Sequence, residues 1–231
     1  MSERILGILA EGFAKILIAS VKVTIPLTII GFTLALCIAL VMAMIQYAKI
    51  PVLSQIARIY IWIFRGTPLL VQLFLAYYGL PKLGIVMDAF PCAVLVFSLN
   101  EGAYCAETMR SALESVSRGQ IEAGYCVGMN YLQIMWHVVL PQAMRTAFPP
   151  LSNSVISMLK DTSLAAEITV ADMFMSAQKI VGRTYEPLWL YSEVALVYLL
   201  FSTVLTILQR YGEKRLNTYQ DKELVTGGKQ S

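Results

Sequence analysis

The chain has 231 residues, of which 57% are hydrophobic and 14% are charged, and its mean hydropathy is +0.64. Soluble domains typically carry about 25% charged residues, so this composition excludes an ordinary soluble protein and indicates an integral membrane protein. The net charge of +3 is too small to indicate a nucleic-acid partner.

Cysteine and histidine usage predicts neither a metal site nor catalysis. The four cysteines lie in apolar or helical segments without a CxxC pair, which is typical of small buried side chains. The single histidine has no ligand partner near it, so we expect no enzyme activity. These residues are Cys37, Cys92, Cys105, Cys126 and His137.

The first membrane span is predicted at residues 16–45, because about 20 apolar residues cross a bilayer. Only Lys22 interrupts it. The segment is too long for a signal peptide, and no small-residue cleavage pattern follows it. The preceding 15 residues have apolar positions at helical spacing, which favours a helix at the membrane interface.

The second span, at residues 53–80, is interrupted by Arg-Gly-Thr-Pro. Thr67 followed by Pro68 is typical of a helix start, as N-cap and first helical residue, and Gly66 permits a break before it. The 13 residues from Pro68 to Leu80 form about 20 Å of helix, too short to span alone. We therefore expect one kinked span, with Arg65 on the cytoplasmic side or at a seam lined by protein.

Three further spans are predicted at residues 90–109, 146–168 and 188–208. The sequence thus predicts one all-α membrane domain over residues 1–231, with five transmembrane helices and termini on opposite sides. Positive charge is expected inside. Ten lysines and arginines lie in segments 46–58, 110–145 and 209–231, and five lie in the segments on the other side. The amino terminus is therefore predicted outside and the carboxyl terminus inside.

The loop at residues 117–141 reads as two short helices on the cytoplasmic side. Ser117 with Gln120 is a capping-box pattern that begins a helix through Cys126. Gly128 suits a left-handed turn, Asn130 caps a second helix, and Pro141 is expected to end it. Such a unit offers a ridge to a partner; the alternative is a simple connector.

Polar residues within the spans indicate a path for substrate, because ionisable groups avoid lipid. Asn100 and Glu101 are predicted near the midplane of the third span. In the fourth span a polar stripe includes Ser157 and either Lys160 or Asp161. We expect Glu101 to meet an ammonium group and Lys160 to meet a carboxylate.

A structural ion pair is expected at the cytoplasmic end of the third span. Glu107 and Arg110 are three residues apart, and Glu114 follows Arg110 by four. Residues at these spacings are neighbours on a helix.

One motif in the loop carries a resemblance to a known family. Glu122-Ala123, four further residues and Gly128 are followed, after nine residues, by Val138-x-Leu140-Pro141. This pattern closely resembles the EAA loop of ABC importer permeases. Two positions depart from the family: Gly124 replaces its usual second alanine, and Val138 its usual isoleucine.

The similarity extends across nearly the whole chain. FRGTPLLVQLF in the second span, SLNEGAYCAETMR in the third and LKDTSL in the fourth are similar to the polar amino acid permease family of ABC importers. Among its members, the cystine-type permeases are the most similar.

This resemblance implies a type I ABC importer permease fold in a bacterial cytoplasmic (inner) membrane, and transport of polar amino acids, with L-cystine a candidate. It also implies that the loop couples to an ATPase through Glu122, Ala123, Gly128, Leu140 and Pro141. Residues 227–229, Gly-Gly-Lys, lack the remainder of a phosphate-binding loop. We therefore expect ATP to be used by a separate subunit and no cofactor to be bound here.

The implied partners are two ATP-binding subunits, a solute-binding protein, membrane lipid and a second permease. The second permease is either another copy or a related chain.

The sequence leaves two other functions as alternatives. An ion-coupled secondary transporter of amino acids usually has two half-repeats with matching broken helices, whereas only one break is evident. A membrane-embedded enzyme needs a nucleophile, a metal cluster or paired acids, whereas the acids here are scattered.

Overall fold

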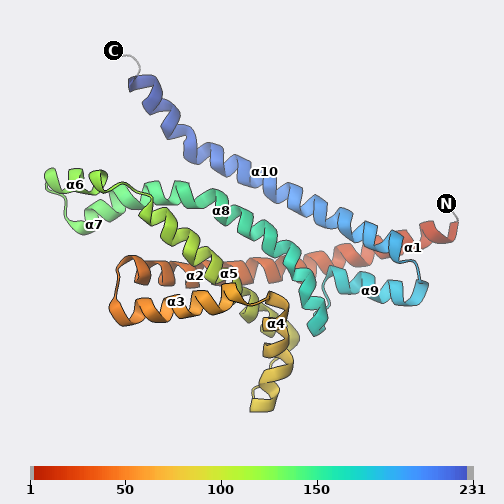
Figure 1. Ribbon diagram of the computed structural model, residues 1–231. Coiled ribbons are helices and arrows are strands. Elements are labelled where there is room, and N and C mark those ends of the chain that lie inside the picture. Colours follow the sequence, from red (N-terminus) through yellow and green to blue (C-terminus); the bar gives the residue numbers. More distant parts are fainter. Residues whose placement is uncertain (1–2, 228–231) are drawn as a thin grey trace.

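The computed structural model describes the backbone of residues 3–227 and the side chains of residues 3–216, and within these ranges the chain is helical without strands. Three long helices dominate its first half. α1 (Glu3–Ala19) continues through a π-helical turn (Ser20–Thr24) into α2 (Ile25–Tyr47), forming a 45-residue segment. The predicted first span therefore begins inside a longer helix. α3 (Pro51–Gly66) then returns alongside α2 (Figure 1).

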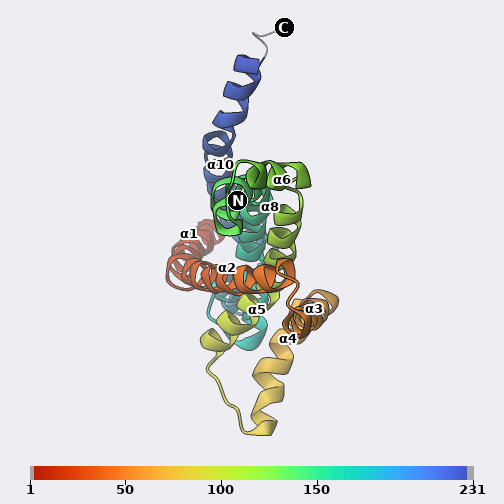
Figure 2. The same cartoon turned by 90° about the vertical axis from the view of Figure 1, so that its left-hand side faces the viewer.

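A sharp bend of 104° separates α3 from the next helical segment. That segment consists of α4 (Leu69–Phe74), a π-helical turn (Leu75–Gly79) and a 3-10 turn (Leu80–Leu83). Figures 1 and 2 both show it projecting away from the other helices. The second predicted span, expected to be kinked, is therefore broken into two segments that lie at a large angle to each other.

The second half begins with α5 (Ala89–Glu114), followed by the short helices α6 (Arg118–Cys126) and α7 (Tyr131–Ile134). A π-helical turn (Met135–Val139) leads into α8 (Leu140–Asp161), and a 3-10 segment (Thr162–Ile168) follows. α9 (Met173–Thr184) and α10 (Pro187–Gly227) complete the described chain.

The core is centred on α2 and α5, which pack closely along their length. α2 buries Gly31, Ala35, Ala39 and Ala43 at four-residue spacing. Small residues on one face let helix backbones approach closely, which is how helices associate where lipid removes the hydrophobic driving force. Many large apolar side chains point outward, as a lipid-facing surface requires.

In the part of the chain that the structure describes, three helical segments are long and apolar enough to cross a membrane: Glu3–Tyr47, Ala89–Glu114 and Pro187–Leu216. The bent pair Pro51–Gly66 and Leu69–Leu83 makes a fourth if it counts as one span. α8, the core of the fourth predicted span, does not qualify, because its polar residues lower its hydropathy. It also begins earlier than predicted and ends at Asp161.

The connections gather at two ends of the molecule. In Figure 1 the α2–α3 turn, the α6–α7 pair and the carboxyl-terminal part of α10 lie toward the left, and the left end faces the viewer in Figure 2. The amino terminus and the α9–α10 connection lie at the right.

Candidate functional site

The break between α3 and α4 lies at Thr67 and Pro68, both in extended conformation. Proline disfavours helical geometry in the residue before it, so the α3 helix stops there. The prediction that Thr67 caps the next helix is wrong. Pro68 occupies the N-cap position, and the Thr67 hydroxyl donates to the Ile63 carbonyl instead.

Two carboxamides stabilise this break. Gln72 Nε2 donates to the carbonyl oxygens of Phe64 and Thr67, at 3.0 and 3.1 Å, and to Thr67 Oγ1. From α5, Asn100 Nδ2 donates to the Phe64 carbonyl and to Gln72 Oε1. The last carbonyls of α3 have no partner within the helix, so these bonds satisfy groups that the break exposes.

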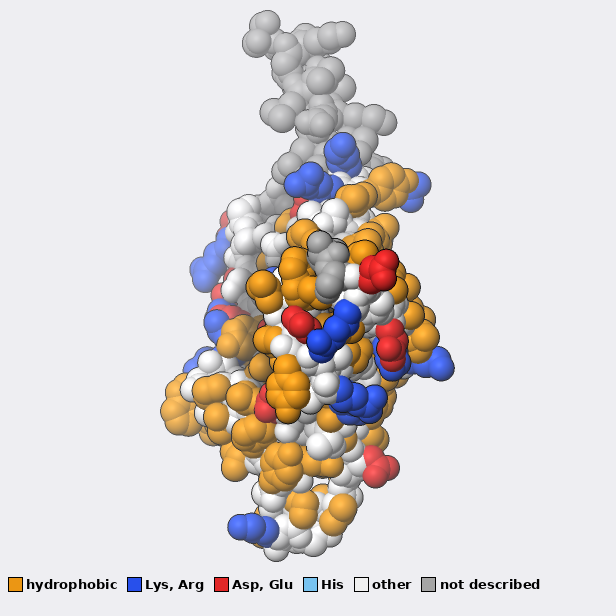
Figure 3. All heavy atoms as spheres, turned by 90° about the vertical axis from the view of Figure 1, so that its right-hand side faces the viewer, with side chains coloured by type: hydrophobic (Ala, Val, Ile, Leu, Met, Phe, Trp, Pro, Cys, Tyr) orange, Lys and Arg blue, Asp and Glu red, His pale blue; other side chains and the backbone are white. Residues whose placement is uncertain are grey.

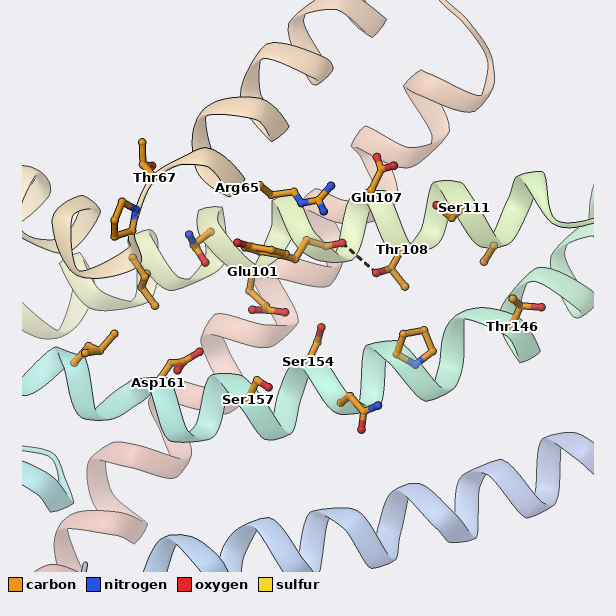
Figure 4. Close-up of a pocket in the computed structure, with 18 residues that line it drawn as sticks. Arg65, Thr67, Glu101, Glu107, Thr108, Ser111, Thr146, Ser154, Ser157 and Asp161 are labelled. Atoms are coloured by element: carbon orange, nitrogen blue, oxygen red, sulfur yellow. Dashed lines mark hydrogen bonds between the residues drawn. The ribbon is translucent and has the colours of Figure 1, made fainter. Parts of the chain in front are cut away.

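A cavity of about 830 Å³ lies beside the break, between the start of α4, α5 and α8. Of the residues predicted for the substrate path, it brings four together: Asn100, Glu101, Ser157 and Asp161. Figure 4 shows Glu101 from α5 facing Ser154, Ser157 and Asp161 of α8. Lys160 is exposed and does not line the cavity.

Lys160 and Asp161 are consecutive residues of α8, so their side chains point about 100° apart around the helix. The predicted role of Lys160, to meet the substrate carboxylate while Glu101 meets the ammonium, therefore does not fit this cavity. The basic side chain in the cavity wall is Arg65, at the end of α3.

Arg65 lies over the ring of Tyr104, with Cζ 5.3 Å from the ring centroid. This position is a cation–π contact, which holds a guanidinium without neutralising it. The sequence predicted Arg65 on the cytoplasmic side or at a seam lined by protein, and gave it no role in the path. The sequence feature that could have predicted Arg65 in the cavity is the Arg-Gly-Thr-Pro break, because the bend brings the last turn of α3 to the cavity.

Charge in the cavity is only partly paired. Glu107 forms an ion pair with Arg110, which also binds Glu114 at 2.6 Å. Glu101 accepts a weak hydrogen bond from Cys105 Sγ at 3.7 Å. Within residues 3–216, neither Glu101 nor Asp161 forms an ion pair. The cavity thus presents acidic groups together with one arginine, an arrangement suited to a zwitterion.

The α6–α7 loop folds around Gly128, which has φ +83° as predicted for a left-handed turn. Its N–H donates to the Tyr125 carbonyl, and the Met129 N–H donates to the Gly124 carbonyl. These two bonds form a Schellman motif that ends α6. A Cβ on Gly124 would lie 2.8 Å from Cγ1 of Ile134, which explains why glycine replaces the usual alanine.

The predicted cap at Asn130 is present as a capping box with Gln133. The capping box at Ser117 is absent, although α6 begins directly after it. The Gln120 carboxamide instead accepts a hydrogen bond from Gln142 of α8, at 2.7 Å. This contact fastens α6 to α8.

Pro141 does not end the second loop helix, contrary to the prediction. The π-helical turn Met135–Val139 precedes it, and Pro141 lies in the first turn of α8. The backbone is helical at both Val139 and Leu140, so the helix runs through Pro141 without a break. The loop therefore continues directly into α8.

The loop presents apolar side chains to its surroundings. Val127 is 77% exposed and Trp136 is 68% exposed, and three others are also exposed: Tyr125, Tyr131 and Leu132. Glu122 and Ala123 are exposed on α6 beside them. An exposed apolar patch with polar residues beside it is typical of a protein-binding surface.

Residues 35–218 match the family described as binding-protein-dependent transport system inner membrane component. The L-cystine transport system permease protein TcyB of Bacillus subtilis (strain 168) is 43% identical over 213 residues, which cover 92% of this chain and 91% of that protein. The probable amino-acid ABC transporter permease protein PatM of Vibrio harveyi is 41% identical over 205 residues, covering 87% and 92%.

A solved structure of an amino acid ABC transporter with histidines superposes with a TM-score of 0.86 at 31% sequence identity. The match covers 93% of this chain and 100% of the chain in that structure. The helical architecture, the polar cavity and the two-helix loop thus accompany a match over nearly the whole chain. The chain belongs to the family of inner membrane components of binding-protein-dependent transport systems, as a permease subunit of an ABC amino acid importer.

Proposed function

We propose that this permease carries L-cystine, and that the substrate crosses through the cavity beside the α3–α4 break. The observation that carries the proposal is the presence of Arg65 and the acids Glu101 and Asp161 around one cavity. L-Cystine has two ammonium and two carboxylate groups, so a low-dielectric path must offer both signs of charge. The 43% identity to a cystine permease supports this substrate.

Each wall of the cavity has a role in this proposal. Arg65 meets a carboxylate, because its planar guanidinium binds carboxylates through two parallel hydrogen bonds. Glu101 and Asp161 meet ammonium groups, and Ser157 donates or accepts between them. Asn100 contributes by fixing the break, since its Nδ2 is committed to Phe64 and Gln72.

We further propose five membrane spans, with α8 as the fourth and its polar side covered by protein. The amino terminus is then outside and the carboxyl terminus inside the bacterial cytoplasmic membrane. The start of α1 and the carboxyl-terminal part of α10 lie at opposite ends of the molecule, which supports an odd number of crossings, and the α2–α3 turn and the α6–α7 loop share the end of α10 (Figure 1). The excess of lysine and arginine in these segments supports the assignment of that end to the inside.

The α6–α7 loop is proposed as the contact with an ATP-binding subunit, which binds and hydrolyses ATP. Glu122 and Ala123 belong to its exposed surface, and Gly128 sets the angle between its two helices. Leu140 and Pro141 join the loop directly to α8. Movement of the loop would therefore reach the cavity wall along one helix.

The complete importer is proposed to contain two permeases, two ATP-binding subunits and a solute-binding protein. The second permease is another copy or a related chain. This chain binds no cofactor of its own.

Transport by the complete importer in proteoliposomes tests the substrate and the cavity together. Uptake of radiolabelled L-cystine should exceed that of arginine, glutamine and histidine supplied through the same binding protein. Glu101→Gln and Arg65→Met should each reduce uptake about 30-fold or more, the usual effect of truncating one partner of a buried charge pair.

Lys160→Met is the matched control, because it removes a charge from α8 outside the cavity. It should transport at the wild-type rate. Wild-type uptake by Glu101→Gln and Arg65→Met would overturn the cavity assignment, and preference for another amino acid would overturn L-cystine.

A further inference from the structure

A second cavity, of about 360 Å³, lies between the amino-terminal helix and α9, far from the substrate path. Its wall contains four basic side chains: Lys15, Lys22, Lys179 and Arg183. Figure 3 views the end of the molecule that holds the amino terminus and α9, and shows lysine and arginine side chains set among hydrophobic ones.

Glu11, one turn before Lys15 in α1, compensates part of this charge within the described chain, through an ion pair with Lys15 and an electrostatic interaction with Arg183. In residues 3–216, Lys22, Lys179 and Arg183 form no ion pair. Three like charges that line one cavity raise the local concentration of anions.

An apolar groove of about 280 Å³ adjoins the basic cavity. It is lined by Leu17, Ile18, Val21 and Lys22, and two of these, Ile18 and Lys22, also line the basic cavity. Ile18 is 54% exposed and Val21 is 57% exposed. Charge and apolar surface therefore meet at one point on the membrane-spanning helix.

The placement of these residues departs from the usual charge distribution. Positive residues normally gather on the inside, and only five lysines and arginines fall in the segments assigned to the other side. Three of those five, Lys15, Lys179 and Arg183, line this single cavity. Their charge does not serve orientation, so an anionic ligand at the site accounts for them.

We propose that this cavity binds the phosphodiester headgroup of an anionic phospholipid. Lys22, Lys179 and Arg183 contact the phosphate, and one acyl chain lies along Ile18 and Val21. Basic pockets between membrane helices bind lipid headgroups through the same chemistry. The apolar groove favours a lipid over the acidic surface of a soluble protein, because a soluble partner would leave the groove uncovered.

The test uses the purified complete importer in phosphatidylcholine nanodiscs, titrated with a fluorescent short-chain phosphatidylglycerol. Lys179→Gln combined with Arg183→Gln should weaken binding about thirtyfold, since each basic residue near a membrane contributes about 1 kcal/mol. The matched control combines Arg4→Gln with Lys82→Gln, which removes the same charge on the same side outside the cavity. The control should bind as tightly as the wild type.

Two further arms identify the ligand. Inorganic phosphate and glycerophosphoglycerol should compete only at far higher concentrations than the lipid, and Val21→Ser should weaken lipid binding without altering competition by phosphate. Equal competition by phosphate would make the site a free-anion site and overturn the lipid assignment. Unchanged lipid affinity in the double variant would also overturn the lipid assignment. Loss of affinity for the binding protein in that variant, with lipid affinity intact, would overturn it as well.

Discussion

Asn100 Nδ2 donates a hydrogen bond to Gln72 Oε1 at 3.0 Å, and this contact joins α5 to the segment that follows the broken helix. Asn100 is only 7% exposed, and its second donor bond reaches the Phe64 carbonyl at the end of α3. One side chain thereby fixes both sides of the break. The break in turn places Arg65 at the cavity.

Replacing this amide should destabilise the permease. Asn100→Leu leaves the Phe64 carbonyl and Gln72 Oε1 without the donor from α5, and an unsatisfied buried polar group costs about 1–3 kcal/mol. The free energy of unfolding should fall by that order, measured by thermal denaturation of the importer in detergent. Thr33→Val, which removes an exposed hydrogen bond to the Ile29 carbonyl of the same helix, is the control. Equal melting temperatures for Asn100→Leu and the wild type would show that the amide does not hold the break.

The turn at Gly128 should be sensitive to any side chain. Its φ of +83° is costly for other residues, on the order of 1–2 kcal/mol for alanine. Gly128→Val should therefore distort the loop and abolish both ATPase binding in pull-down assays and uptake. Gly119→Ala is the matched control, because Gly119 lies in α6 with free space around it. Normal ATPase binding by Gly128→Val would reduce the loop to a connector.

The proposed orientation predicts which sites a membrane-impermeant thiol reagent can reach. In a background without native cysteines, Lys82→Cys should react in intact cells, and Arg118→Cys should react only after permeabilisation. Both side chains are exposed, so burial does not determine the result. Labelling of Arg118→Cys in intact cells would reverse the orientation.

Asp172, which lies between the proposed fourth and fifth spans, predicts a pH dependence. It is fully buried, and burial raises the pKa of its carboxyl from 3.8 to about 6, although the Met175 N–H bond opposes the shift. The ionised form is therefore costly in the folded state. The penalty is present above about pH 6 and disappears as the pH falls toward the unfolded pKa.

Asp172→Asn removes this charge at every pH and keeps an oxygen for the Met175 N–H. Between about pH 7.5 and pH 5 the wild type should gain about 1 kcal/mol of stability relative to Asp172→Asn. Thermal denaturation of both proteins across this range measures the difference. Parallel pH profiles would mean that Asp172 does not titrate there.

Much of the architecture could be predicted from local patterns. The long apolar runs predicted α2, α5 and α10. Gly128 and Asn130 predicted the turn and the cap of the loop, because a turn and a cap depend on residues that are adjacent in the sequence. The break at Thr67 was visible for the same reason. Its angle was not, because the angle depends on Asn100, 28 residues beyond Gln72.

Other features depended on contacts that no local pattern contains. The Ser117 capping box failed because Gln120 bonds to Gln142 on another helix. Pro141 continued into α8 because a π-helical turn precedes it. Arg65 lines the cavity and Lys160 does not. Helical periodicity could not predict this, because the bend after α3 determines which basic side chain faces α5.

In the proposed function, an external ATPase acting through the α6–α7 loop drives this permease. The most direct measurement is L-cystine uptake into proteoliposomes that contain the permease, its ATPase and the binding protein, with ATP enclosed and no ion gradient. Uptake should require enclosed ATP, and it should be lost with Gly128→Val but not with Gly119→Ala. Uptake by the permease without the ATPase, driven by a sodium or proton gradient, would contradict the proposed function.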